Sequence, residues 1–210
     1  MRLLLIRHGD SHHAYRQVIA GPAGCTGLTA RGVQQTHALA ARLRATGEVR
    51  GCVSLRCSPW LRARQTAELL AAALPGVPIE EDPGLCELVP GEADGLSWET
   101  YRTRYGAFPL PAEPDRPFSP GGESWTAFTG RVETTLLDLA RRFAGQTVVA
   151  VTHAGFIVVA CLVLFGLSDH QPGRRARLDP AHTALTEWWV EGGAWRLVRY
   201  NDAAHLREGA

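Results

Sequence analysis

Two histidines and two arginines occur where phosphoryl chemistry could use them. His8 follows Arg7 directly, Arg62 lies near the start of a helical pattern, and His153 follows an apolar run. An imidazole can act as a nucleophile, and guanidinium groups bind phosphate oxygens through paired hydrogen bonds. If the fold brings these side chains together, they form a pocket suited to a tetrahedral dianion, with a histidine available as the nucleophile.

Transfer of a phosphoryl group also requires a proton for the leaving alkoxide, and a carboxylic acid can supply it. Glu87, in the segment Leu85-Cys86-Glu87-Leu88, is the first candidate. Glu92 and Asp94 follow closely in the chain and remain alternatives.

Further residues extend the predicted phosphate site. Gly9 and Gly155 carry no Cβ, so the backbone at these positions can approach an anion closely. The helix expected from about Gly155 would add N–H donors at its N-terminus. Ser11, His12 and His13 follow in a loop and are expected to contact substrate.

Hydrophobic patterning predicts the elements that must position these side chains. Continuous apolar runs predict buried strands over residues 3–6, 52–55 and 147–152, and residues 183–190 and 195–200 are expected to form terminal strands. Helices are predicted from the cap Thr29 to Gly47, from Pro59 at the first turn to about Leu74, over 123–143, and from about Gly155. Strands that alternate with helices indicate an α/β three-layer sandwich with a largely parallel sheet. The candidate residues then lie at the carboxyl ends of strands, where sites form in such sheets.

The segment 75–122 is rich in proline, glycine and acidic residues and is interpreted as an insertion rather than a core element. We expect one domain over 1–210, with a substrate-specificity lid at about 87–122 that contains a short helix near 98–105. A basic and aromatic group in that helix is expected to pack the lid onto the body, with base stacking as the alternative. Its members are Trp98, Tyr101, Arg102, Arg104 and Tyr105.

Composition narrows the classes of function. The net charge of +1 gives no electrostatic reason to expect nucleic acid or anionic membrane as a partner. All 22 basic residues are arginines, which excludes lysine chemistry and the Walker-type phosphate loop.

The five cysteines form no CxxC pair, which is typical of free thiols in a reducing compartment. The N-terminal apolar run is interrupted by Arg7, and the apolar stretch 156–165 is too short for a membrane span, so a cytoplasmic location is expected.

Taken together, the motifs resemble the histidine phosphatase superfamily, in its phosphoglycerate mutase-like branch. The matching segments are Leu4-Leu5-Ile6-Arg7-His8-Gly9, Gly27-Leu28-Thr29-Ala30-Arg31-Gly32, Ser58-Pro59-Trp60-Leu61-Arg62-Ala63-Arg64-Gln65-Thr66-Ala67, Glu87 with Gly91, Pro120-Gly121-Gly122-Glu123-Ser124, and Thr152-His153-Ala154-Gly155. The resemblance implies that His8 is phosphorylated, that Arg7, Arg62 and His153 bind the phosphoryl group, and that Glu87 is the proton donor. It also implies a small phosphorylated substrate and activity without a metal or other cofactor.

Departures from the family pattern favour a phosphatase over a mutase. Mutases of this branch usually read Arg-His-Gly-Glu-Ser, followed soon by an asparagine, whereas this chain reads Gly9-Asp10-Ser11-His12-His13 without one. Ala154 follows His153, where mutases tend to place glycine and asparagine. The motif after the acid is degenerate, as Gly91-Glu92-Ala93-Asp94-Gly95.

Four alternatives to the phosphatase make different demands on the sequence. A mutase-type phosphotransferase stays open. A non-catalytic phospho-ligand domain would have no use for both a nucleophile and an acid. A cysteine phosphatase needs Cys-x5-Arg, but only four residues separate Cys57 from Arg62. A metal site at His8, His12 and His13 lacks a second ligand cluster.

Trp188 and Trp189 on a terminal strand could support a homodimer.

Overall fold

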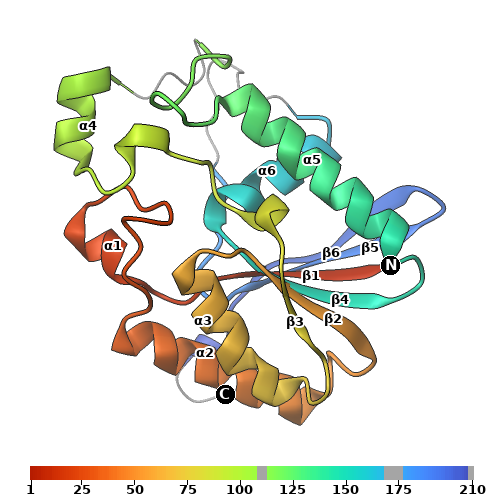
Figure 1. The fold of residues 1–210 in the computed structure, drawn as a ribbon. Coiled ribbons are helices and arrows are strands. Elements are labelled where there is room, and N and C mark those ends of the chain that lie inside the picture. The colour runs from red at the N-terminus through yellow and green to blue at the C-terminus, as the bar shows by residue number, and fades with distance from the viewer. Residues whose placement is uncertain (108–112, 168–176, 208–210) are drawn as a thin grey trace.

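A computed structural model describes residues 1–107, 113–167 and 177–207, and its centre is a six-stranded sheet (Figure 1). The strands are β1 (Arg2–Arg7), β2 (Cys52–Cys57), β3 (Ile79–Glu81), β4 (Thr147–Thr152), β5 (Leu185–Glu191) and β6 (Ala194–Asp202), in the spatial order β3-β2-β4-β1-β5-β6. The strands β3, β2, β4 and β1 run parallel, and β5 and β6 close the sheet with antiparallel pairings. The expected largely parallel sheet is confirmed.

Helices cover both faces of this sheet, as the alternation within β1 requires. Leu4 and Ile6 pack into the cluster that α2 (Ala30–Thr46) and α3 (Leu61–Leu70) build on one face. Leu3 and Leu5 pack on the other face, against α5 (Trp125–Arg142) and α6 (Ala154–Leu164). Because both faces are covered, the four residues between Arg2 and Arg7 in β1 are all apolar. The three-layer α/β sandwich is therefore confirmed.

Local sequence signals set both ends of α2 but not the start of α3. The Thr29 hydroxyl accepts a hydrogen bond from the N–H of Gly32 and caps α2, and Gly47 ends this helix at φ 65°. The expected start of α3 at Pro59 is wrong. Trp60 has an extended backbone, so the first helical residue is Leu61, and α3 ends at Leu70 before a short 3-10 turn.

The segment 75–122 contributes more to the sheet than expected. Its residues Ile79–Glu81 form β3, a parallel edge strand beside β2, so the interpretation that this segment holds no core element is wrong there. All three residues are exposed and two are acidic, so the pattern of a buried strand is absent.

The helices α1 (His12–Arg16) and α4 (Trp98–Tyr105) lie beyond the carboxyl end of β1, outside the three layers (Figure 1). The helix α4 has the predicted bounds, and Ser97 caps it. Ile19, Ala93, Tyr101 and Phe118 form a small buried cluster that packs α4 against the segments around it. Residues 108–112 of the expected lid lie outside the described residues.

All five cysteines are buried and unpaired. Within the described ranges, no helix is both long and apolar enough to cross a membrane.

Candidate active site

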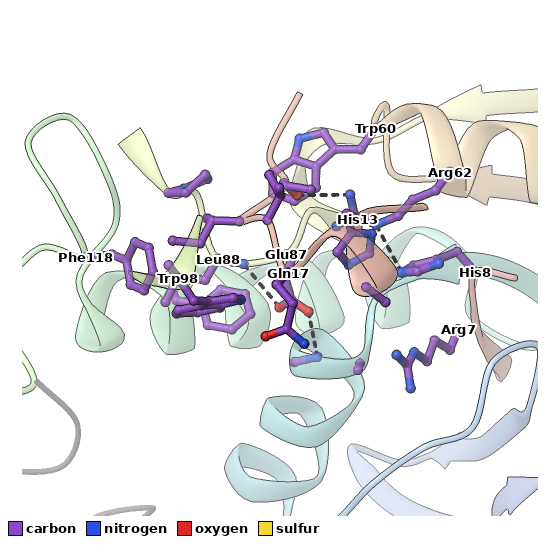
Figure 2. A pocket seen from close by; sticks show the side chains of 18 of the residues that line it. Arg7, His8, His13, Gln17, Trp60, Arg62, Glu87, Leu88, Trp98 and Phe118 are labelled. Carbon is purple, nitrogen blue, oxygen red and sulfur yellow. Dashed lines mark hydrogen bonds between the residues drawn. The ribbon is translucent and has the colours of Figure 1, made fainter. Parts of the chain in front are cut away.

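The predicted phosphate residues meet at the carboxyl ends of three parallel strands. Arg7 ends β1 and His8 follows it, His153 follows β4, and Arg62 lies on the first turn of α3, which begins after β2. The ring centroids of His8 and His153 are 5.1 Å apart. The Nε of Arg62 lies 3.1 Å from Nε2 of His8. Side chains far apart in the sequence therefore form one cluster (Figure 2).

Hydrogen-bond partners fix the tautomer of His8. Its Nδ1 lies 2.7 Å from the carbonyl oxygen of Gly9, which can only accept, so Nδ1 carries the proton. Arg62 donates from Nε to Nε2, which is consistent with an unprotonated Nε2. The imidazole thus presents the lone pair of Nε2 beside a guanidinium group.

Buried imidazoles in this cluster favour the neutral form. Burial lowers the pKa of His8 well below its usual value, and the charge of Arg62 lowers it further. The same two causes, in the same order, lower the pKa of His153. The Nε2 of His153 lies 2.9 Å from the Ser58 hydroxyl, and the ring of Trp60 packs against it at a centroid distance of 5.0 Å.

The guanidinium groups of Arg7 and Arg62 form no ion pair with a carboxylate of the described residues. Arg7 donates to the carbonyl of Pro180 at 2.6 Å, and Arg62 donates to the carbonyl of Ala20 at 3.0 Å. Arg62 also stacks on Trp60, with its guanidinium carbon 4.9 Å from the ring centroid. Backbone and aromatic contacts orient the two cations, while their charge is left for an anion.

Glu87 lines the same pocket as His8. Its carboxylate accepts the N–H of Gly155 at 2.8 Å and that of Leu88 at 3.2 Å. The two rivals have other roles. Neither lines the pocket: Glu92 is exposed, and Asp94 accepts hydrogen bonds from the backbone N–H groups of Gly21, Ala23 and Gly24 at 2.8 Å each. The geometry therefore favours Glu87 as the acid.

Arg131 of α5 holds the chain on which Glu87 lies. Its guanidinium donates to the carbonyl oxygens of Gly84, Cys86 and Glu87 at 2.8, 3.0 and 3.1 Å. It also pairs with both carboxylate oxygens of Glu123 at 2.7 Å, and Glu123 accepts the N–H of Val89. Glu123 belongs to a motif that the sequence analysis named, but Arg131 was not predicted. Its partners are Glu123 and three backbone carbonyl oxygens, and no sequence pattern predicts contacts with backbone groups.

Each of the two glycines predicted to lie at the phosphate site makes room for another part of the protein. A Cβ on Gly9 would lie 2.7 Å from the carbonyl oxygen of Gly32, so Gly9 allows the approach of α2. A Cβ on Gly155 would lie 2.1 Å from the Glu87 carboxylate, so Gly155 makes room for the candidate acid. Both glycines permit close packing between protein groups, and only Gly155 lines the pocket.

The residues after Gly9 divide into two groups. His13 lines the pocket and lies 6.2 Å from His8 between ring centroids. Ser11 and His12 were also expected to contact substrate, but they are not among the residues that line the pocket. The Ser11 hydroxyl is buried and bonded to His13 Nδ1 at 2.8 Å, and His12 is exposed on α1. The expected loop here is a short helix, which turns adjacent side chains in different directions.

Sequence reasoning missed His182, whose ring centroid lies 5.6 Å from that of His8. Its Nδ1 is 3.9 Å from an oxygen of Asp10, and its Nε2 is buried without a hydrogen-bond partner among the described residues. One sequence feature could have found it: His182 directly precedes the terminal strand that was predicted over residues 183–190. Because β5 runs antiparallel to β1, the residues that precede β5 lie where β1 ends.

The pocket beside this cluster has a volume of about 470 Å³, and His153 and His182 are not among the residues that line it. Arg7, His8 and Arg62 lie at one end of it, Glu87 and Gln17 lie in the middle, and aromatic side chains lie at the far end (Figure 2). In the described parts of the chain, no group of three or more histidine, cysteine or acidic side chains has a geometry that could hold a metal ion.

Comparison with known proteins supplies the family. The model of the histidine phosphatase superfamily (branch 1) matches residues 3–203. The chain belongs to this superfamily. It is 26% identical to the "Metal-independent phosphoserine phosphatase" of Arabidopsis thaliana, over 97% of this chain and 82% of the relative. It is 30% identical to the "Probable phosphoglycerate mutase GpmB" of an Enterobacter strain, over 98% of this chain and 95% of the relative. The solved structure of Bacillus stearothermophilus YhfR has the same fold, with a TM-score of 0.83, 23% identity and coverage of 98% of this chain and 99% of that one.

Replacing Gly155 by alanine is expected to lower kcat for phosphoryl transfer by about 10- to 100-fold, since small misplacements of a reacting group cost that much. The new methyl group occupies the space of the Glu87 carboxylate. That carboxylate is the end of a flexible side chain, so the thermal midpoint should change little. Steady-state kinetics and thermal unfolding test this. The matched control is Gly130→Ala on α5, where a Cβ meets nothing within 4 Å. Equal kinetics for the two variants would contradict the prediction.

Acid should destabilise the protein between pH 7 and pH 5, before most carboxylates are protonated. Below its usual pKa each histidine of the unfolded chain binds a proton, whereas His8 and His153 in the fold resist it. The free energy of unfolding is therefore highest above about pH 6.5 and falls with pH, by up to about 2 kcal/mol for each of these histidines at pH 5. Urea unfolding at several pH values measures the slope. His153→Gln should reduce it and the exposed His37→Gln should not, and a flat profile in the wild-type protein would contradict the expectation.

Proposed function

We propose that the protein is a metal-independent phosphomonoesterase that transfers a phosphoryl group first to His8 and then to water. The observation that carries the proposal is the unprotonated Nε2 of His8, which lies in the pocket beside the guanidinium of Arg62. The presence of Glu87 in the same pocket supports it, since a nucleophile and an acid are both required.

In the first step, the lone pair of His8 Nε2 attacks phosphorus and the bond from phosphorus to the ester oxygen breaks. Arg7 and Arg62 stabilise the negative charge on the phosphoryl oxygens. Arg62 can turn its Nε–H from Nε2 to one of these oxygens as Nε2 becomes bonded. The carboxyl group of Glu87 gives its proton to the leaving oxygen, and the alcohol departs.

In the second step, water attacks the phosphorus of the phosphohistidine. The Glu87 carboxylate accepts the proton of this water, so it acts first as an acid and then as a base. The bond between phosphorus and Nε2 breaks, inorganic phosphate leaves, and His8 regains its lone pair. The hydrogen bond from Nδ1 to Gly9 holds the ring in one orientation throughout the cycle.

A phosphoglycerate mutase is the second candidate, favoured by the relative that carries this name at 30% identity. It would return the phosphoryl group from His8 to an organic acceptor instead of water. Two neighbours of the cluster support hydrolysis. The Asp10 carboxylate is engaged by Tyr15 and Thr29 at 2.9 and 2.8 Å and does not line the pocket, so it is not placed to hold an organic acceptor. Ala154 lines the pocket but has no polar side chain to hold one.

The fate of the phosphoryl group distinguishes the two functions. A panel of phosphomonoesters, including phosphoglycerates and phosphoserine, is incubated with the enzyme in isotopically labelled water. Hydrolysis predicts that each turnover releases one phosphate containing one labelled oxygen. Exchange of the phosphoryl group between glycerate positions faster than phosphate release would instead establish the mutase.

A further inference from the structure

The pocket has a charged end and an aromatic end. Arg7, His8 and Arg62 lie at one end, and Trp98 and Phe118 lie at the other (Figure 2). When the phosphoryl group of a phosphomonoester lies at His8, its alcohol part therefore extends toward the aromatic end of the pocket.

Four side chains build this aromatic wall, which we define as Trp98, Phe118, Trp125 and Phe128. Trp98 meets Phe118 edge to face at a centroid distance of 6.0 Å, and Trp125 meets Phe128 at 5.8 Å. Behind them Tyr101 stacks on Phe118 at 4.4 Å, which holds α4 in place. Phe118 and Phe128 are buried, whereas Trp98 is 38% exposed and offers apolar surface to the pocket.

Positive charge is confined to the phosphate end of the described pocket lining. Its only arginines are Arg7 and Arg62, which are both beside His8. Burial lowers the pKa of His13 to about 4, so this side chain is neutral near pH 7. Arg102 and Arg104 on α4 are exposed and lie outside the lining. A carboxylate or second phosphate on the alcohol part would lose its water against the aromatic wall without gaining a cation.

We propose that this pocket selects phosphomonoesters whose alcohol part carries an aromatic or extended apolar group and no second charge. The inference rests on the phosphomonoesterase function proposed above and specifies its substrate class. The aromatic wall buries the apolar group, and the two arginines are left to the single phosphoryl group.

The test compares alkyl phosphates whose leaving alcohols have similar acidity, so that differences report recognition. Naphthylethyl phosphate, ethyl phosphate, phosphoserine and phosphoglycerate serve as the panel. Burial of a naphthyl group should raise kcat/KM about 100-fold over that of ethyl phosphate. Phosphoserine and phosphoglycerate should not exceed ethyl phosphate.

Variants assign the preference to the wall. Trp98→Ala should reduce the ratio of kcat/KM for naphthylethyl phosphate over ethyl phosphate about tenfold, chiefly through KM. The matched control is Trp189→Ala, which removes an exposed tryptophan of β5 outside the pocket and should leave the ratio unchanged. An equal loss of the ratio in both variants would overturn the inference.

Two further outcomes separate this inference from the proposed function. If phosphoserine or phosphoglycerate is hydrolysed more efficiently than naphthylethyl phosphate, the substrate class is wrong and the phosphatase stands. If no ester is hydrolysed, the proposed function fails, and calorimetric binding to the His8→Ala protein still tests the substrate class. The expected order of affinity is naphthylethyl phosphate above ethyl phosphate and phosphoserine. The reverse order would refute the inference.

Discussion

Replacement of His8 by alanine is expected to lower kcat for phosphomonoester hydrolysis by roughly 10⁴- to 10⁶-fold, the range seen when a nucleophile is removed from an enzyme. The alanine has no lone pair to attack phosphorus, and direct attack by water would have to proceed without the covalent intermediate. Arg7 and Arg62 remain, so the variant should still bind phosphomonoesters. Steady-state kinetics together with calorimetric binding measure the two effects separately.

The matched control for this variant is His12→Ala. His12 is exposed on α1 and lies outside the pocket wall, so its removal should leave kcat within about twofold. A His8→Ala protein that is folded and retains kcat within tenfold of wild type would show that another group receives the phosphoryl group.

Replacement of Glu87 by glutamine should lower kcat/KM by about 10²- to 10⁴-fold for an alkyl phosphate, which is the usual contribution of a general acid. The amide can still accept the N–H of Gly155, so the pocket keeps its shape, but it cannot protonate the leaving oxygen. The loss of kcat/KM should be much smaller for p-nitrophenyl phosphate, because nitrophenolate leaves without a proton and kcat/KM includes only the steps up to its departure. The loss of the base in the second step should lower kcat for both esters. Comparison of the two esters therefore isolates proton transfer from positioning.

The control for Glu87→Gln is Glu92→Gln, at an exposed carboxylate that was the sequence-based rival. It should behave as the wild-type protein toward both esters. If Glu87→Gln lowered kcat/KM equally for both esters, Glu87 would not protonate the leaving oxygen. A selective loss in Glu92→Gln instead would move the acid to that position.

Sequence alone predicted those parts of the site that follow buried strands. The apolar runs before His8 and His153 are long enough to predict strands, and the parallel sheet then brings the strand ends together. The arrangement at the edge of this cluster was harder to predict. The directions of His12 and His13 depend on a five-residue helix that has no clear sequence pattern.

Residues whose roles depend on tertiary contacts were missed. His182 reaches His8 only because β5 runs antiparallel to β1, and the sequence does not state the direction of a strand. Arg131 acts on backbone carbonyls of a segment far away in the chain. The strand β3 was missed because it is short, exposed and acidic, which is the opposite of the pattern for a buried strand.

The aromatic end of the pocket shows the same limit. Trp98 and Tyr101 were correctly placed on a short helix, and packing of the lid was the expected role. Tyr101 packs in this way, with its hydroxyl donating to the Phe118 carbonyl at 2.8 Å. Trp98 also lines the pocket. That position depends on where α4 lies relative to the pocket, which residue spacing does not predict.

Trapping of the phosphoenzyme tests the central claim most directly. A radiolabelled phosphomonoester is mixed with the enzyme, quenched in base within the first turnovers, and the labelled peptide is identified. The phosphohistidine mechanism predicts a label that is stable in base, is lost in acid and lies on the peptide containing His8, in an amount approaching one per chain. Label on a serine or cysteine, or rapid turnover without any labelled protein, would contradict transfer through His8.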